Sequence, residues 1–184
     1  MSRLGRSFYA RPTLEVAAEL IGKYLVHEVA GRTLAGCIVE TEAYIGEEDQ
    51  ASHARFGRTA RSALMYGDPG MAYVFLIYGM HHCFNVVCER KEFPAAVLVR
   101  ALELEENAGS GPGRLCRALE ISRSHNGLDV TSPPLWIEAR DQQAVEIVTT
   151  PRIGVEYAGA WAKKSWRFVD AKSRSLSHRL SQTR

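Results

Sequence analysis

The sequence predicts a single mixed α/β (α+β) domain, built on a curved, mostly antiparallel β-sheet with a protruding β-hairpin and peripheral helices. Strand-like segments outnumber helical ones along the chain, which favours this class. A length of 184 residues is enough to bury a sizeable core. No internal repeat, low-complexity tract or linker divides the chain.

The expected elements follow the hydrophobic pattern in chain order. A helix is predicted over 14–21, with Thr13 as its cap and Gly22 as its end. A short amphipathic helix is predicted over 114–121. Apolar, β-branched and aromatic residues predict strands over 23–29, 33–44, 72–77, 83–88, 95–102, 135–138 and 145–149.

Three parts of the chain are distinguished by these patterns. We expect residues 1–11 to form a flexible N-terminal lead, 12–168 to form the folded domain, and 169–184 to form a basic, frayed C-terminal tail. The beginning of the chain lacks the continuous apolar core of a secretory segment, and no apolar run approaches membrane-spanning length. The simplest expectation is an intracellular protein with reduced cysteines, not a secreted one.

The charge of the chain permits a polyanionic partner without requiring one. The formal net charge is +2, and arginines far outnumber lysines. Arginine forms planar, bidentate contacts with phosphates better than lysine does. Genomic bias explains an arginine excess equally well, so the composition leaves both explanations open.

The most informative segment is 37–44, which reads C-I-V-E-T-E-A-Y. Because side chains alternate along a strand, Glu40, Glu42 and Tyr44 project from one face. An edge strand with a wet outer face would account for one glutamate. Two carboxylates and an aromatic ring on one face, with His53 following shortly afterwards, favour a functional site instead.

Two further segments are suited to nucleic-acid contacts. The tip between two predicted strands reads Tyr78-Gly79-Met80, and large apolar side chains at a tip either fold back onto the domain or enter a base stack as a wedge. The segment 53–61 alternates Arg55, Arg58 and Arg61 with glycine and threonine, which can present donors to phosphates. A solvated loop is the alternative for that segment.

Other kinds of site are not favoured. Adjacent His81 and His82 would point to opposite faces of a strand, and the four cysteines follow no zinc-ligand spacing, so no metal is expected. The glycines of 109–113 lack a lysine and the P-loop spacing, so no nucleotide cofactor is expected. No Gly-x-Ser-x-Gly elbow is present in the sequence.

Several blocks in order resemble the alkyladenine (3-methyladenine) DNA glycosylase family, the monofunctional alkylpurine type and not the helix-hairpin-helix one. The resemblance covers roughly residues 12 to 168. The blocks are V-E-T-E-A-Y at 39–44, D-x-x-S-H at 49–53, G-R-T at 57–59, M-Y-G-D-P-G at 65–70, Y-V-F-L-I-Y-G-M-H at 73–81, N-V-V at 85–87, V-L-V-R-A-L-E at 97–103, G-P-G-R-L-C-R-A-L at 111–119, P-R-I-G-V at 151–155 and W-R-F at 166–168.

The resemblance implies a role for each matching catalytic position. Glu42 matches the general base that activates water against the deoxyribose C1′. Arg100 and the backbone carbonyl of Ile153 match the groups that help to hold this water.

The resemblance also implies the DNA-binding positions. The base-pocket positions are Tyr44, His53, Phe75 and Asn85, and Asn85 matches the residue that obstructs the 2-amino group of guanine. Tyr78 matches the intercalating wedge, with Met80 beside it. The phosphate contacts fall at Arg58, Thr59 and Arg61. The implied partner is double-stranded DNA containing damaged purines, bound by a monomer without a cofactor, metal or membrane. The implied location is cytoplasmic and nucleoid-associated, or nuclear in a eukaryote.

Two departures from the family pattern stand out. Phe75 falls where many relatives have tyrosine, so its ring is kept and a hydroxyl is lost. The loop over 103–110 is shorter than the family pattern implies, which affects peripheral contacts and not the chemistry.

Two other functions stay open at the level of sequence. A carbohydrate hydrolase could use Glu40 and Glu42 as paired carboxylates, because their same-face spacing is near the inverting range. A non-catalytic nucleic-acid binder could use the arginine-rich segment and Tyr78 alone.

Overall fold

The computed structural model describes residues 2–141 and 145–180. Its strands are β1 Ser2–Arg3, β2 Tyr24–Val29, β3 Arg32–Ile45, β4 Ala72–Ile77, β5 His81–Val87, β6 Ala95–Glu103, β7 Leu135–Ala139, β8 Ile147–Thr150 and β9 Arg167–Asp170. Its helices are α1 Arg6–Tyr9, α2 Thr13–Leu20 and α3 Pro112–Ala118, with short 3₁₀ helices at η1 His53–Phe56, η2 Ala63–Tyr66, η3 Glu105–Asn107, η4 Arg123–His125 and η5 Glu156–Lys163.

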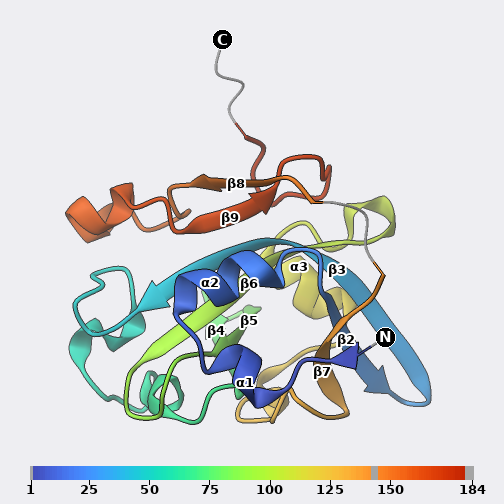
Figure 1. The fold of residues 1–184 in the computed structure, drawn as a ribbon, viewed down its shortest axis with the longest axis horizontal. Helices are drawn as coiled ribbons and strands as arrows, with labels where there is room; N and C mark the ends of the chain where they lie inside the picture. The colour runs from blue at the N-terminus through green and yellow to red at the C-terminus, as the bar shows by residue number, and fades with distance from the viewer. Residues whose placement is uncertain (1, 142–144, 181–184) are drawn as a thin grey trace.

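The strands form one antiparallel sheet, as predicted. Seven strands follow the order β1-β7-β2-β3-β6-β5-β4, while β9 pairs with β3 and β8 pairs with β9. Figure 1 shows β3 arching across the whole molecule, with the β8–β9 hairpin running along one side of it. Because β3 pairs with β6 on one side and with β2 and then β9 on the other, the strand that carries the two glutamates is central.

The main core lies between the sheet and two helices. On α2, Val16, Ala17 and Leu20 are fully buried, at the spacing that places them on one helical face. Leu115 and Cys116 of α3 join the same cluster. These apolar stripes hold α2 against β3 and β6, and α3 against β5 and β6.

The pairing of β3 with β6 is irregular where the glutamates begin. Ile38 pairs with Leu102 and Glu40 pairs with Ala101, after which the register shifts again so that Arg100 has no direct partner. A β-bulge of this kind bends a strand and redirects its side chains. The bulge therefore places Arg100 in the part of β6 that faces the glutamates.

The two ends of the chain are more structured than the sequence predicts. Within the expected flexible lead 1–11, β1 pairs with β7, and Tyr9 is fully buried against the core. Within the expected frayed tail 169–184, β9 continues to Asp170 and Ser175 is buried. Burial of aromatic and apolar side chains near each end supplies the stabilisation that the polar local composition did not indicate. Residues 1 and 181–184 lie outside the described residues.

The protruding hairpin is confirmed as β4 and β5. At its tip both Tyr78 and Gly79 have positive φ angles, 52° and 70°, and the Met80 N–H donates to the Ile77 carbonyl. Ile77 pairs with His81, so Tyr78, Gly79 and Met80 form a three-residue hairpin loop. Within the described parts of the chain, no helix has both the length and the apolar character needed to cross a membrane.

Candidate active site

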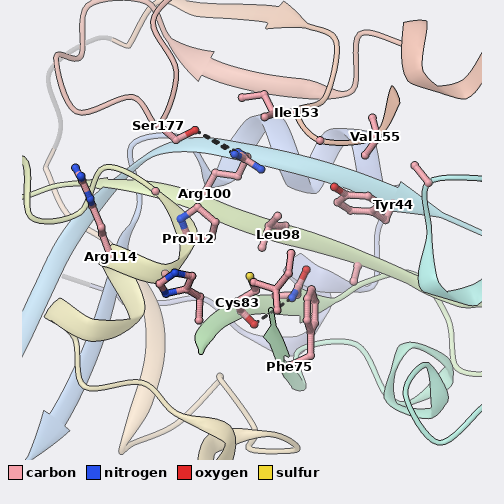
Figure 2. A pocket seen from close by; sticks show the side chains of 18 of the residues that line it. Tyr44, Phe75, Cys83, Leu98, Arg100, Pro112, Arg114, Ile153, Val155 and Ser177 are labelled. Carbon is pink, nitrogen blue, oxygen red and sulfur yellow. Dashed lines mark hydrogen bonds between the residues drawn. The ribbon is translucent and has the colours of Figure 1, made fainter. Parts of the chain in front are cut away.

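A pocket of about 860 Å³ opens where β3, β6 and the β4–β5 hairpin meet. Figure 2 shows Tyr44, Arg100 and Ile153 along one side of this hollow, with Phe75 across from them. The start of α3 and the C-terminal segment 176–178 complete the lining. Residues from distant parts of the sequence thus converge on one cavity.

Glu42 lies directly behind the pocket wall and is fully buried. Its Oε1 accepts a hydrogen bond from the Ile153 backbone N–H at 2.8 Å. Its Oε2 accepts from the Tyr44 hydroxyl at 2.8 Å and from Arg100 Nη1 at 3.4 Å. All three donors line the pocket, so the carboxylate is held at the pocket by groups that also face it.

The environment of Tyr44 changes the pKa of its hydroxyl. Burial, followed by the adjacent negative charge of Glu42, raises the pKa of the Tyr44 hydroxyl well above its ordinary range. The hydroxyl therefore remains protonated and acts as a donor to the carboxylate at neutral pH.

Glu40 occupies a different environment from Glu42, although both are fully buried. Its Oε1 accepts from Arg167 Nε at 2.7 Å and from Arg100 Nε at 3.1 Å. Burial opposes its ionisation, but the bonds from Arg167 and Ser177 outweigh burial and hold the Glu40 pKa below its ordinary value. Glu40 is thus an ionised anchor between two arginines, and like Glu42 it is bonded to residues that line the pocket.

The loop that carries Ile153 is fixed by a buried ion pair. Arg152 forms a bidentate pair with Asp49, with Nη1–Oδ2 and Nη2–Oδ1 distances of 2.6 and 2.8 Å, and both side chains are buried. Arg152 Nη1 also donates to the Ala43 carbonyl, and its guanidinium lies 4.8 Å from the Tyr44 ring centroid. One residue therefore holds the Ile153 backbone and covers one side of the Tyr44 ring.

Aromatic rings from η1 and β4 line the other side of the pocket. The rings of His53 and Phe75 meet edge to face with centroids 4.6 Å apart, and His53 Nδ1 bonds to the Tyr73 hydroxyl at 2.8 Å. The structure thus places Tyr44, His53 and Phe75 in the lining of one pocket. Phe75 is held by ring contacts alone, in keeping with its missing hydroxyl.

His53 is neutral in this environment. Burial, with smaller contributions from the positive charges of Arg61 and Arg55, lowers the His53 pKa from 6.5 to about 4. At neutral pH the pocket therefore presents an uncharged imidazole.

Asn85 lies on β5 at the floor of the pocket and is nearly fully buried. Its amide nitrogen donates to the backbone carbonyls of Tyr73 and Cys83, at 3.0 and 3.4 Å. These two bonds fix the orientation of the side chain, so Asn85 is a rigid part of the floor.

The hairpin tip projects away from the domain. Tyr78 is 84% exposed and Met80 is 69% exposed, so the alternative in which the tip folds back onto the domain is wrong. Tyr78 also adopts a left-handed backbone conformation that costs a side-chain-bearing residue about 1 kcal/mol. An exposed aromatic residue held in a strained turn is typical of a functional position.

The members of the arginine-rich segment 53–61 differ in their contacts. Arg58 forms an exposed ion pair with Glu92 at 2.7 Å. Arg61 lies over the Phe75 ring at 5.1 Å and donates to a carbonyl of β4. Thr59 instead bonds with Ser62 through its hydroxyl and its backbone N–H, which makes it part of the turn.

Several residues at the site were not identified from the sequence. Arg114 and Arg117 of α3 line the pocket, and Ser177 from the predicted tail reaches Arg100. The two arginines belong to the G-P-G-R-L-C-R block, so the resemblance could have identified them. Ser177 lies in no block of the resemblance, so the sequence offered no means of identifying it. No group of three His, Cys, Asp or Glu side chains able to hold a metal occurs among residues 2–141 and 145–180.

Comparison with known proteins points to one family. A family model described as methylpurine-DNA glycosylase (MPG) matches residues 7–174. A protein of Anaeromyxobacter sp. (strain Fw109-5) is 52% identical, over 91% of this chain and 88% of its own length. A protein of Methanocella arvoryzae is 50% identical, over 97% of this chain and 98% of its own length. Both relatives have the name "Putative 3-methyladenine DNA glycosylase".

Proposed function

Since the chain belongs to the methylpurine-DNA glycosylase family, we propose that its pocket binds an alkylated or deaminated purine flipped out of duplex DNA and hydrolyses the N-glycosidic bond. The observation that carries this proposal is the Glu42 carboxylate. It is buried directly behind the pocket wall and bonded to Tyr44, Arg100 and Ile153, which all line the pocket.

The proposed chemistry is a single hydrolytic displacement. Glu42 takes a proton from a water molecule whose oxygen bonds to the deoxyribose C1′, while the bond from C1′ to the purine nitrogen breaks and its electron pair leaves with the base. The sugar carries positive charge in the transition state, which the nearby carboxylate stabilises. The products are the free base and an abasic site.

In this proposal Arg100 and the Ile153 backbone orient the water and the carboxylate. Arg100 reaches Glu42 from β6, and the Ile153 N–H fixes the other carboxylate oxygen at 2.8 Å. We predict that the Ile153 carbonyl accepts a hydrogen bond from the second proton of this water, the one that Glu42 does not take. Such positioning lowers the barrier by presenting the water in line with the bond that breaks.

The base would stack between Tyr44 on one side and Phe75 and His53 on the other. A methylated purine that carries positive charge is electron-deficient and stacks well on aromatic rings. The neutral imidazole of His53 avoids repulsion of that charge. Rigid Asn85 on the floor would obstruct the 2-amino group of an undamaged guanine.

We propose that DNA contacts outside the pocket come from three surfaces. Tyr78, with Met80 beside it, would fill the space of the flipped nucleotide. Arg58 and Arg61 would contact phosphates, with Thr59 shaping the turn between them. The pocket-lining Arg114 and Arg117 of α3 would add positive charge.

The site geometry disfavours a carbohydrate hydrolase. That mechanism needs a second carboxylate able to act as an acid or a base. Glu40 accepts bonds from Arg100, Arg167 and Ser177, and the bonds from Arg167 and Ser177 hold its pKa below the ordinary value, so it is not available as an acid. A lyase step through a Schiff base is also not proposed, because no lysine occurs among the pocket-lining residues of the described chain.

The experiment that tests the function is a base-release assay on duplexes that each contain one lesion. The lesions are 3-methyladenine, 7-methylguanine, hypoxanthine and ethenoadenine, with undamaged duplex as the control. We expect free base and an alkali-labile abasic site from at least the 3-methyladenine duplex. Binding of all the duplexes without any release of base would contradict the proposal and favour a non-catalytic binder.

A further inference from the structure

The C-terminal segment beyond β9 returns to the candidate active site. Ser175 is buried, its hydroxyl donates to Asn107 at 3.1 Å, and its carbonyl accepts from Ser110 at 2.9 Å. Arg167 Nη2 holds the next turn through the His178 carbonyl at 2.9 Å. These contacts tie residues 175–178 to the sheet and to the loop after β6, so that Leu176, Ser177 and His178 line the pocket.

Ser177 makes the most specific contacts in this segment. Its backbone N–H donates to Glu40 Oε2 at 2.6 Å, and its hydroxyl donates to Glu40 Oε1 at 2.7 Å. The same hydroxyl oxygen accepts from Arg100 Nε and Nη2, both at 3.3 Å. Figure 2 shows the hydroxyl directed at the Arg100 guanidinium.

The nitrogen atoms of the Arg100 guanidinium have different partners. Nε and Nη2 are held by Ser177, with Nε also held by Glu40, whereas Nη1 is the nitrogen that reaches Glu42. The Nη1–Glu42 distance of 3.4 Å is long, so this contact alone fixes the guanidinium poorly. The plane of the guanidinium must therefore be set from the Nε side.

We propose that Ser177 is a positioning residue that orients Arg100 toward Glu42 for the hydrolytic step. This inference rests on the proposed function, because it assigns to Ser177 a part in the same reaction. Glu40 supplies the negative charge, and the Ser177 hydroxyl supplies the directional acceptor that fixes how the guanidinium is rotated. The active site is then completed by a residue close to the C-terminus.

A purely structural role for Ser177 is the alternative. In that case the hydroxyl would only anchor the C-terminal segment, as the Ser175 hydroxyl does through Asn107. The two serines form a matched pair, since both lie in one segment and both hydroxyls are hydrogen-bonded. Of these two serines, Ser177 is the one that contacts Glu40 and Arg100, so Ser175→Ala is the control for loss of anchoring.

The test measures single-turnover base release, affinity for lesion-containing duplex and melting temperature for Ser177→Ala, Ser177→Thr and Ser175→Ala. We expect Ser177→Ala to slow base release per folded molecule by roughly tenfold, the scale of one hydrogen bond to a charged group. Its affinity and melting temperature should change little, because the backbone bond to Glu40 remains. Ser177→Thr retains a hydroxyl and should recover most of the rate, and Ser175→Ala should release base at the wild-type rate.

A second comparison tests whether Ser177 acts through Arg100. In an Arg100→Lys background, Ser177→Ala should have no further effect, because the group that it orients is absent. The inference is overturned if Ser177→Ala releases base at the wild-type rate, if Ser175→Ala is slowed equally, or if the two losses multiply. Failure of the proposed function is distinct, because the wild-type protein itself would then release no base from any lesion duplex.

Discussion

At the scale of single residues, two glutamates separated by one position have different environments. Glu40 accepts bonds from the side chains of Arg100 and Arg167 and from Ser177, whereas Glu42 accepts bonds from Tyr44, Arg100 and the Ile153 backbone. The difference arises outside the strand, from the bulge at Arg100 and from the C-terminal segment that reaches Glu40. Residue type and spacing alone therefore do not assign their roles.

Glu40→Gln should reduce stability more than it reduces chemistry. The substitution leaves Arg100 and Arg167 buried with reduced compensation, and breaking a buried ion pair is strongly destabilising. We expect the melting temperature to fall by roughly 5 °C or more. Excision per folded molecule should fall much less than in Glu42→Gln. An unchanged melting temperature would show that the buried network does not stabilise the fold.

His53 gives a prediction for the dependence of stability on pH. Its pKa is about 4 in the folded protein and 6.5 ordinarily, so below pH 6.5 the unfolded chain binds the proton first. The stability that neutral His53 contributes is present above pH 6.5 and is lost as the pH falls toward 4. As the pH falls from 6.5 to 4, the melting temperature of the wild type should therefore decrease relative to that of His53→Gln. A difference that is constant with pH would contradict the burial of a neutral imidazole.

At the scale of elements, the β4–β5 hairpin separates the proposed wedge at its tip from the buried residues at its base. Tyr73 and Val74 are buried near the start of β4, whereas Tyr78 projects from a strained turn at the end. The tip buries little apolar surface, so its side chains contribute little to folding. The hairpin is therefore a rigid support for an exposed ring.

Tyr78→Ala should lower excision from duplex DNA strongly while leaving the melting temperature unchanged. In the proposed wedge role, the Tyr78 ring would offset an unstacking cost of a few kcal/mol, comparable to one base–aromatic contact of about 1–3 kcal/mol. Tyr78→Phe and Tyr78→Trp should retain much of the activity. Phe56 is 71% exposed on η1 and serves as the matched control, because Phe56→Ala removes an exposed ring elsewhere. A destabilised Tyr78→Ala protein with normal excision per folded molecule would refute the wedge.

At the scale of the whole molecule, two separate elements place arginines beside the pocket although the net charge is only +2. Arg114 and Arg117 of α3 line the pocket, while Arg55 and Arg61 from the loop after β3 lie over the pocket-lining rings of Tyr157 and Phe75. Elements distant in sequence thus place cations beside one pocket. This distribution suits a polyanion that passes across the pocket.

Arg58→Ala should weaken binding to undamaged duplex and reduce the dependence of affinity on salt by about one counterion, without altering lesion preference. Arg58 is paired with Glu92 in the free protein, so a substitution of Glu92 is a matched control with the opposite expected effect on binding. Glu92→Gln should free the guanidinium and strengthen binding. Arg61→Ala should also weaken binding, and it additionally removes a contact with Phe75. If Arg58→Ala and Arg61→Ala leave the salt dependence unchanged, the arginine-rich segment does not contact DNA.

Local patterns predicted much of the fold, because alternation and turn residues determine strands one at a time. The β4 bounds agree with the prediction, and the hairpin tip lies at Tyr78 as expected. The Arg152–Asp49 pair, the bulge at Arg100 and the approach of Ser177 to Glu40 were not predicted. Each depends on contacts between residues far apart in sequence, which no local periodicity records.

The proposed function depends most directly on the role of Glu42. The most direct measurement is single-turnover base release by Glu42→Gln on a duplex that contains one lesion, with binding to the same duplex measured in parallel. We expect binding to be retained and release to slow by at least roughly a hundredfold, the usual scale for loss of a general base. Glu40→Gln, corrected for its folded fraction, is the control. Equal losses of release in the two variants, or wild-type release by Glu42→Gln, would contradict the assignment of Glu42 as the base.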